Sequence, residues 1–132
     1  MLGHLPLMIV PFILYNAGLA GFFGGADPWD SSLFTLTMIS GGIWSMTVKD
    51  LMIVVALILL FVEVLKSTRT SNASVLDHLL SLTVFVLFLV EFLLVRGAAT
   101  SLFFVLMFIA LVDVLAGFTV SLRAASRDVN HR

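Results

Sequence analysis

Three carboxylates lie within long apolar stretches of the sequence, and they are the side chains best suited to do chemistry. Glu63 and Glu91 stand near the ends of two such stretches, and Asp113 lies deep inside a third. A charged side chain at the depth of a lipid bilayer costs about 2.5–3.5 kcal/mol, so each acid requires a partner or a function. Intramembrane acids are typical of proton pathways, but they also hold helices together through hydrogen bonds.

Two explanations of these acids remain open. The first is a relay of exchangeable protons, for which the candidate residues run in the order Glu91, Asn16, Asp113 and Glu63, with Asp77 and His78 where protons enter from the cytoplasm. In the second, local partners satisfy each acid. Glu63 then pairs with Lys66 three residues later, and Asp113 joins helices by a hydrogen bond to Tyr15, Asn16 or Ser81.

Other chemistry finds little support in the sequence. The three histidines are far apart and lack the spacing of metal ligands, so we expect no metal site. The sequence has no nucleophile-and-base set, phosphate-binding loop or metalloprotease motif. We therefore expect no catalytic residues, no cofactor and no enzymatic activity.

The composition requires an apolar environment around these acids. Of the 132 residues, 61% are hydrophobic and 11% are charged, and the mean hydropathy is +1.17. Soluble domains carry about 25% charged residues, so the chain is predicted to be a membrane protein with the lipid bilayer as its first partner. The net charge of −1 argues against a nucleic-acid partner. The absence of cysteine excludes disulfides and thiolate sites.

Four apolar segments predict the fold. About 20 apolar residues cross a bilayer as a helix, and the sequence offers such segments at residues 5–23, 47–66, 74–96 and 100–122. The second segment opens with Thr47 followed three residues later by Asp50, which resembles a capping box. We expect an all-α membrane protein whose single domain, residues 1–132, is an antiparallel bundle of four transmembrane helices.

Residues 33–46 predict a different element between the first two helices. Apolar side chains alternate with threonines over residues 34–38, and the alternation resumes around Trp44 after Gly41-Gly42. This alternation has the period of a strand, and the glycine pair suits a turn. We expect a small external β-hairpin. An interfacial helix is the alternative, which the glycines and threonines oppose.

Small residues indicate where the helices pack. In the first helix Ala17 and Gly21 are four residues apart with Gly18 beside them, and in the fourth Ala110 and Gly117 share a stripe with the deepest acid. Small side chains let membrane helices approach closely. The three acids all lie on small or polar stripes, so we expect them to point into the bundle.

Positive charges predict the orientation. Five lie on one side of a four-crossing arrangement and two on the other: Lys66, Arg69, Arg123, Arg127 and Arg132 against Lys49 and Arg96. Cytoplasmic loops are enriched in Lys and Arg. We therefore expect a multi-pass protein of the bacterial inner membrane with both termini in the cytoplasm and the hairpin outside.

The segments GGIWSMTVKDLMIV, LLFVEVLKSTRTS, LDHLLS, FLVEFLLVRGAATS and LVDVLAGFTVS resemble uncharacterised small four-helix inner-membrane proteins of proteobacteria. The resemblance covers residues 33–122 and implies location and topology, without a known activity. Small multidrug-resistance transporters differ because the first helix here carries no acid. Claudin-like proteins share only the external β-element, since their paired cysteines are absent here.

The function expected from these observations is non-enzymatic. The small-residue faces favour an accessory or scaffold subunit that forms a homo-oligomer or docks onto a larger membrane complex. The alternative is a small proton-coupled transporter or channel that uses the intramembrane carboxylates.

Overall fold

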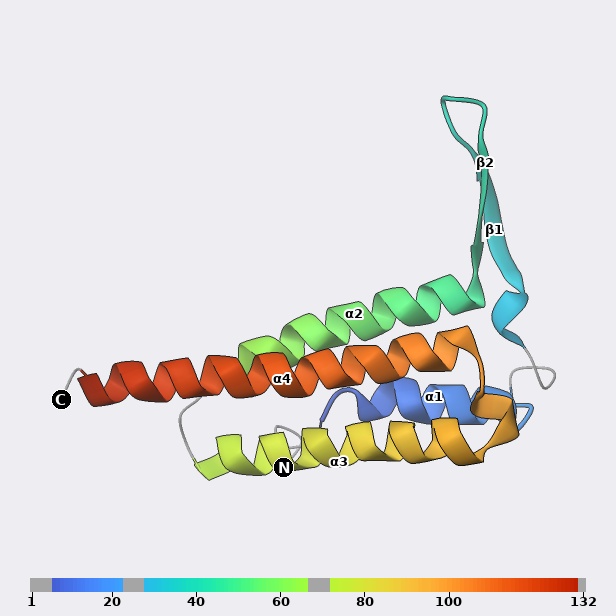
Figure 1. Ribbon diagram of the computed structural model, residues 1–132. Coiled ribbons are helices and arrows are strands. Elements are labelled where there is room, and N and C mark those ends of the chain that lie inside the picture. Colours follow the sequence, from blue (N-terminus) through green and yellow to red (C-terminus); the bar gives the residue numbers. More distant parts are fainter. Residues whose placement is uncertain (1–5, 23–27, 67–71, 131–132) are drawn as a thin grey trace.

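The computed structural model describes residues 6–22, 28–66 and 72–130. In these ranges it contains four α-helices and one two-stranded antiparallel sheet (Figure 1). The helices are α1 (Ile9–Leu19), α2 (Val48–Lys66), α3 (Asn72–Leu94) and α4 (Ser101–Asn130), the strands are β1 (Ser32–Thr37) and β2 (Ile43–Thr47), and two short 3₁₀ helices are η2 (Pro28–Asp30) and η3 (Arg96–Ala98). The prediction of a helical protein with a hairpin is confirmed.

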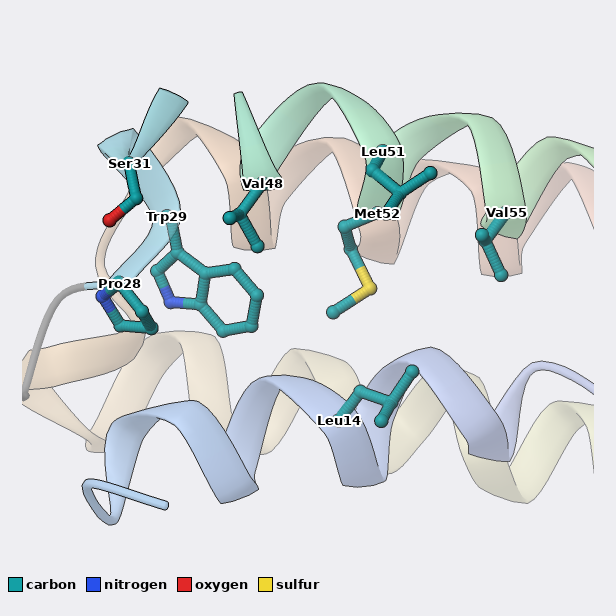
Figure 2. A pocket seen from close by; sticks show the side chains of 8 residues that line it. All are labelled: Leu14, Pro28, Trp29, Ser31, Val48, Leu51, Met52 and Val55. Carbon is teal, nitrogen blue, oxygen red and sulfur yellow. The ribbon is translucent and has the colours of Figure 1, made fainter. Parts of the chain in front are cut away.

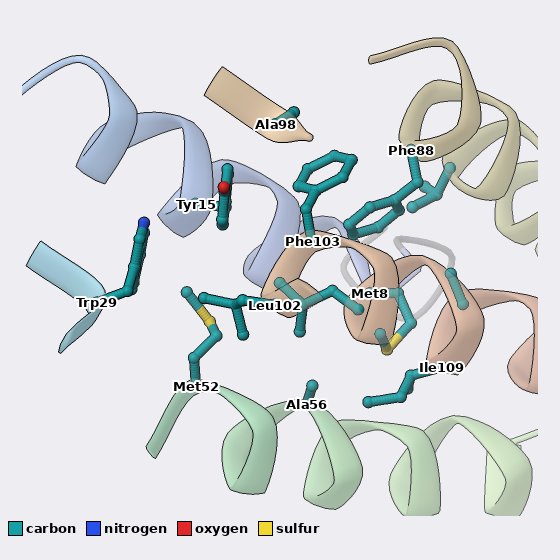
Figure 3. Close-up of a cluster of buried hydrophobic side chains, with 13 residues drawn as sticks. Met8, Tyr15, Trp29, Met52, Ala56, Phe88, Ala98, Leu102, Phe103 and Ile109 are labelled. Atoms are coloured by element: carbon teal, nitrogen blue, oxygen red, sulfur yellow. The ribbon is translucent and has the colours of Figure 1, made fainter. Parts of the chain in front are cut away.

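The prediction of a bundle of four transmembrane helices is not confirmed. Among the described residues, two helical stretches are long and apolar enough to cross a membrane, Leu76–Leu94 and Ser101–Val120. The four helices lie alongside one another, and α4 packs along both α2 and α3 (Figure 1). The core between them contains Tyr15, Phe88 and Phe103, all almost completely buried (Figure 3).

The first helix is shorter than the predicted 5–23. At 11 residues it is about 16 Å long, well below the roughly 30 Å of a hydrocarbon core. It ends because Gly21 adopts a left-handed conformation, with φ of 92°. The Gly21 amide donates to the Gly18 carbonyl at 3.1 Å, and the Phe22 amide donates to the Ala17 carbonyl at 3.0 Å. These two bonds form a Schellman motif, the usual end of a helix at glycine.

The prediction that Gly21 packs against another helix is therefore wrong. Gly21 is exposed, and a Cβ built on it meets no atom within 4 Å. Glycine is favoured at this position because the left-handed conformation that ends the helix is strained for other residues. Gly18 of α1 is buried and Ala17 of the same helix is half-buried, which is compatible with the predicted packing face.

The hairpin predicted over residues 33–46 is present and projects away from the helices (Figure 1). Leu36 lies opposite Trp44 across the two strands, and the Thr35 and Ser45 hydroxyls are 2.9 Å apart on the other face. The turn closes through a hydrogen bond of 2.7 Å from the Met38 amide to the Gly42 carbonyl. All of β1 and most of β2 are exposed, so the hairpin is an arm with both faces uncovered by the described residues.

The remaining helix ends follow local chemistry. The capping box expected at the start of α2 is confirmed: the Asp50 amide donates to the Thr47 hydroxyl and the Thr47 amide donates to the Asp50 carboxylate, both at 3.2 Å. The last helix continues to Asn130, past the predicted end at residue 122. The added residues include alanines and arginines, which are strong helix formers, and contain no glycine or proline.

The hairpin turn yields a matched test. Gly41 has φ of 89° whereas its neighbour Gly42 has an ordinary φ and room for a Cβ in normal contact. A left-handed conformation costs a non-glycine residue about 1–2 kcal/mol. We expect Gly41→Ala to accelerate amide hydrogen exchange across the hairpin about 5–30-fold. Gly42→Ala should leave exchange unchanged, and equal acceleration by both variants would contradict this turn.

Candidate functional site

Five titratable residues and a serine gather at one end of the bundle. They come from the end of α2, the first half of α3 and the middle of α4, and the whole cluster is Glu63, Lys66, Asp77, His78, Ser81, Asp113 and Gly117. These side chains surround a cavity of about 10 Å³, which is close to the space one water needs. We call this group the acid cluster. Its helices come together because α2 and α3 run antiparallel and α4 packs against both (Figure 1).

Glu63, a member of the acid cluster on α2, connects this helix to the residues just before α1. Its Oε1 accepts a hydrogen bond of 2.7 Å from the Leu7 amide, just before α1, and one of 3.2 Å from Lys66 Nζ. The predicted ion pair with Lys66 is confirmed. Glu63 is buried, with 6% of its surface exposed. A buried carboxylate requires such partners, so Glu63 fixes the start of α1 against the end of α2.

Asp113 occupies the middle of the acid cluster. It is 5% exposed, forms a hydrogen bond with the Ser81 side chain of α3, and lies within electrostatic reach of Glu63 and Lys66 of α2. Ala110 and Gly117, about one turn away on either side, are buried. The prediction that Asp113 points into the bundle on a small-residue stripe is confirmed, and Ser81 is the helix-joining partner among those considered.

Asp77 and His78 line the same small cavity as the two buried acids. The His78 ring packs edge-to-face on Phe118, with 5.9 Å between ring centroids. Both residues are half-buried. The structure therefore brings the pair considered for proton uptake next to Glu63 and Asp113.

The other two relay candidates lie toward the opposite end of the bundle. The Asn16 side chain interacts with the Glu91 carboxylate, and its Nδ2 also donates to the Phe12 carbonyl at 2.9 Å. The second carboxylate oxygen of Glu91, Oε2, is buried and has no hydrogen-bond partner among the described residues. Glu91 and Asn16 thus form a separate polar pair between α3 and α1.

Tyr15 serves a third connection. Its hydroxyl donates to the Gly97 carbonyl at 3.0 Å and lies 2.8 Å from the Thr100 hydroxyl. Its ring is 1% exposed and stacks on Trp29, with 5.1 Å between centroids and 6° between planes. Tyr15 therefore joins α1 to the connection between α3 and α4, and it does not bond to Asp113.

Aromatic side chains separate the two polar groups. Phe88 and Phe103 are completely buried, with ring centroids 5.2 Å apart. Phe88 lies on α3 between Ser81 and Glu91, which are ten residues or about 15 Å apart along the helix. The continuous order Glu91, Asn16, Asp113, Glu63 is therefore interrupted. Of the acids in that order, Glu91 is the one that the Asn16 side chain contacts among the described residues.

Two hydrogen-bonding groups were not predicted from the sequence, the Leu7 amide and the Thr100 hydroxyl. The Leu7 amide has no side-chain signature, and its approach to Glu63 follows only from the packing of α1. Thr100 does have a local signal, because it stands just before an apolar run and its hydroxyl accepts the Phe103 amide at 3.2 Å, as an N-cap does. No group of three or more metal-ligating side chains is formed by the described residues.

Comparison with known proteins gives no relative: no family model, curated protein or solved structure matches the chain. The resemblance to small inner-membrane proteins of proteobacteria therefore stays a prediction. The function has to be argued from the chain's own geometry.

The acid cluster predicts a difference between two substitutions at one position. Asp113→Leu leaves the buried Ser81 hydroxyl without its partner, and we expect it to lower the free energy of unfolding by about 1–3 kcal/mol. Asp113→Asn keeps a polar partner for the Ser81 hydroxyl, so it should lower the free energy of unfolding clearly less. Unfolding in mild detergent measures both variants. Equal losses, or a further loss on adding Ser81→Ala to Asp113→Leu, would contradict the hydrogen bond.

Proposed function

We propose that this chain is a multi-pass protein of the bacterial inner membrane that acts as a non-enzymatic accessory or scaffold subunit. Its two candidate spans are mostly uncovered by the rest of the protein, since only 17% of one and 39% of the other are buried. The core helix of a soluble protein would be mostly buried. Large apolar side chains exposed along both helices, among them Leu79, Leu93 and Phe108, suit contact with lipid.

The path of the chain supports four passes with both termini on one side. Leu7 lies beside Glu63 near the end of α2, whereas Tyr15 reaches Gly97 at the opposite end of the bundle. The segment from Leu7 to Tyr15 therefore leads from the acid-cluster end toward the hairpin end of the bundle. The charges of α2 lie near its two ends, leaving an uncharged stretch over residues 51–62. The excess of positive charge near the acid cluster favours a cytoplasmic position for that end.

The observation that carries the scaffold role is the hairpin arm, β1 with β2. It projects from the bundle with its apolar side chains exposed, including Leu36 at 49%, Ile43 at 74% and Trp44 at 42%. Exposed apolar surface and open strand edges are typical of protein interaction sites. An arm that the protein's own helices leave uncovered is suited to contact a second copy or another membrane subunit.

A proton-handling role is the second candidate, and one observation favours it. Glu63, Asp113, Asp77 and His78 share a cavity with room for about one water. Buried acids next to a histidine are suited to exchange protons. The aromatic layer of Phe88 and Phe103 argues against passage through a single chain, so transport would require an oligomer.

The scaffold role predicts assembly through the arm. In mild detergent, native mass spectrometry should find the wild-type chain in a homo-oligomer or with co-purified subunits. The triple variant Leu36→Ser, Ile43→Ser, Trp44→Ser should be monomeric, because it removes the exposed apolar surface of the arm. The exchange of Thr35→Ser with Ser45→Thr on the polar face is the matched control and should assemble normally. A wild-type monomer without any partner would contradict the scaffold role.

Proteoliposomes separate the two candidates. The scaffold role predicts no proton flux under an imposed pH gradient, with or without Asp113→Asn. Flux that the wild-type protein supports and Asp113→Asn abolishes, while the variant remains folded, would favour the proton-handling role.

A further inference from the structure

A second cavity, larger and of different character, lies at the end of the bundle that carries the hairpin (Figure 2). It has a volume of about 350 Å³ and is partly open to the surroundings. It lies between α1, α2 and η2, and its lining residues are Leu14, Pro28, Trp29, Ser31, Val48, Leu51, Met52 and Val55. We call it the α1/α2 groove. Its volume is within the range of about 300–1,000 Å³ found for ligand sites.

The chemistry of the α1/α2 groove is almost entirely apolar. Trp29 and Met52 are buried at its floor, with 5% and 6% exposed, and Leu51 is exposed at its rim. An apolar cavity does not hold ordered water, because water there lacks polar partners. Leaving it empty sacrifices dispersion contacts around its wall. The favourable occupant is therefore an apolar chain.

Polar groups lie at one end of this groove. Ser31 is the single polar lining residue, and the exposed ion pair between Lys49 Nζ and Asp30, at 3.5 Å, adjoins it in the sequence. From Val48 to Val55 the groove follows α2 for about 10 Å. Its polar end is thus where α2 meets the hairpin, and its apolar end lies toward the middle of the bundle. This polarity matches an amphiphile whose head stays at the membrane surface.

We propose that the α1/α2 groove binds one acyl chain of a membrane phospholipid, with the headgroup beside Asp30 and Lys49. The proposal rests on the membrane insertion argued above. In that setting the exposed rim at Leu51 adjoins lipid, so the surrounding medium supplies the occupant directly. The bound chain would fill the space beneath the hairpin and contact the buried indole of Trp29.

Trp29 provides the probe. The chain has two tryptophans, so the full-length variant Trp44→Phe leaves the groove indole as the sole one. The variant is reconstituted in phosphatidylcholine vesicles with brominated or with ordinary acyl chains, because bromine quenches an indole on contact. We expect Trp29 to lose most of its fluorescence in the brominated vesicles. Lipid around the protein cannot reach a side chain so deeply buried except through the groove.

Two substitutions on α2 test the route. Val55→Phe adds a ring to the apolar end of the groove and leaves less room for the acyl chain, so it should weaken the quenching of Trp29 in brominated vesicles. Val54→Phe adds the same ring on the exposed side of α2, outside the groove lining, and should leave quenching intact. The proposal is overturned if Trp29 is not quenched, which is also the result expected if a second copy of the chain occupies the groove. It is overturned as well if Val55→Phe does not reduce the quenching.

Membrane insertion is measured in the same vesicles by alkaline extraction. Protein that is extracted would refute the membrane proposal itself. Protein that resists extraction but keeps its Trp29 fluorescence would refute only the acyl-chain site.

Discussion

The buried carboxylate of Glu63 is the constraint on which the packing of this bundle depends. A charged group that is 6% exposed is tolerated only with partners close by. Two donors meet at its Oε1, the Leu7 amide and Lys66 Nζ. The first brings the chain before α1 to the end of α2, and Asp113 joins α3 and α4 nearby through Ser81. One end of the bundle is therefore determined by polar contacts.

The two ends of the protein consequently differ in what they offer. At the acid-cluster end Glu63 and Asp113 join helices, and the aromatic layer of Phe88 and Phe103 separates them from Glu91. The opposite end carries the hairpin arm and the α1/α2 groove beside each other (Figures 1 and 2). A scaffold subunit that binds a lipid and a protein partner would use the hairpin end. The acid-cluster end would hold the helices together.

Much of the local structure could be predicted from the sequence, because its causes are local. The hairpin follows from strand-period alternation around Gly41, and the start of α2 follows from the Thr47–Asp50 capping box. The burial of Asp113 follows from its stripe of small residues. The end of α1 could not be predicted, because a glycine that closes a Schellman motif and one that packs against a helix look alike in sequence. The Leu7–Glu63 bond depends on tertiary packing alone.

Glu63 and Lys66 form a buried ion pair at the acid-cluster end of the bundle. A double-mutant cycle with Glu63→Gln and Lys66→Met, measured as free energies of unfolding in mild detergent, gives the coupling energy of this pair. The buried geometry predicts a coupling energy above about 1 kcal/mol, beyond the range of exposed pairs. A coupling of about 0.3–0.5 kcal/mol, as for exposed neighbours on a helix, would contradict it.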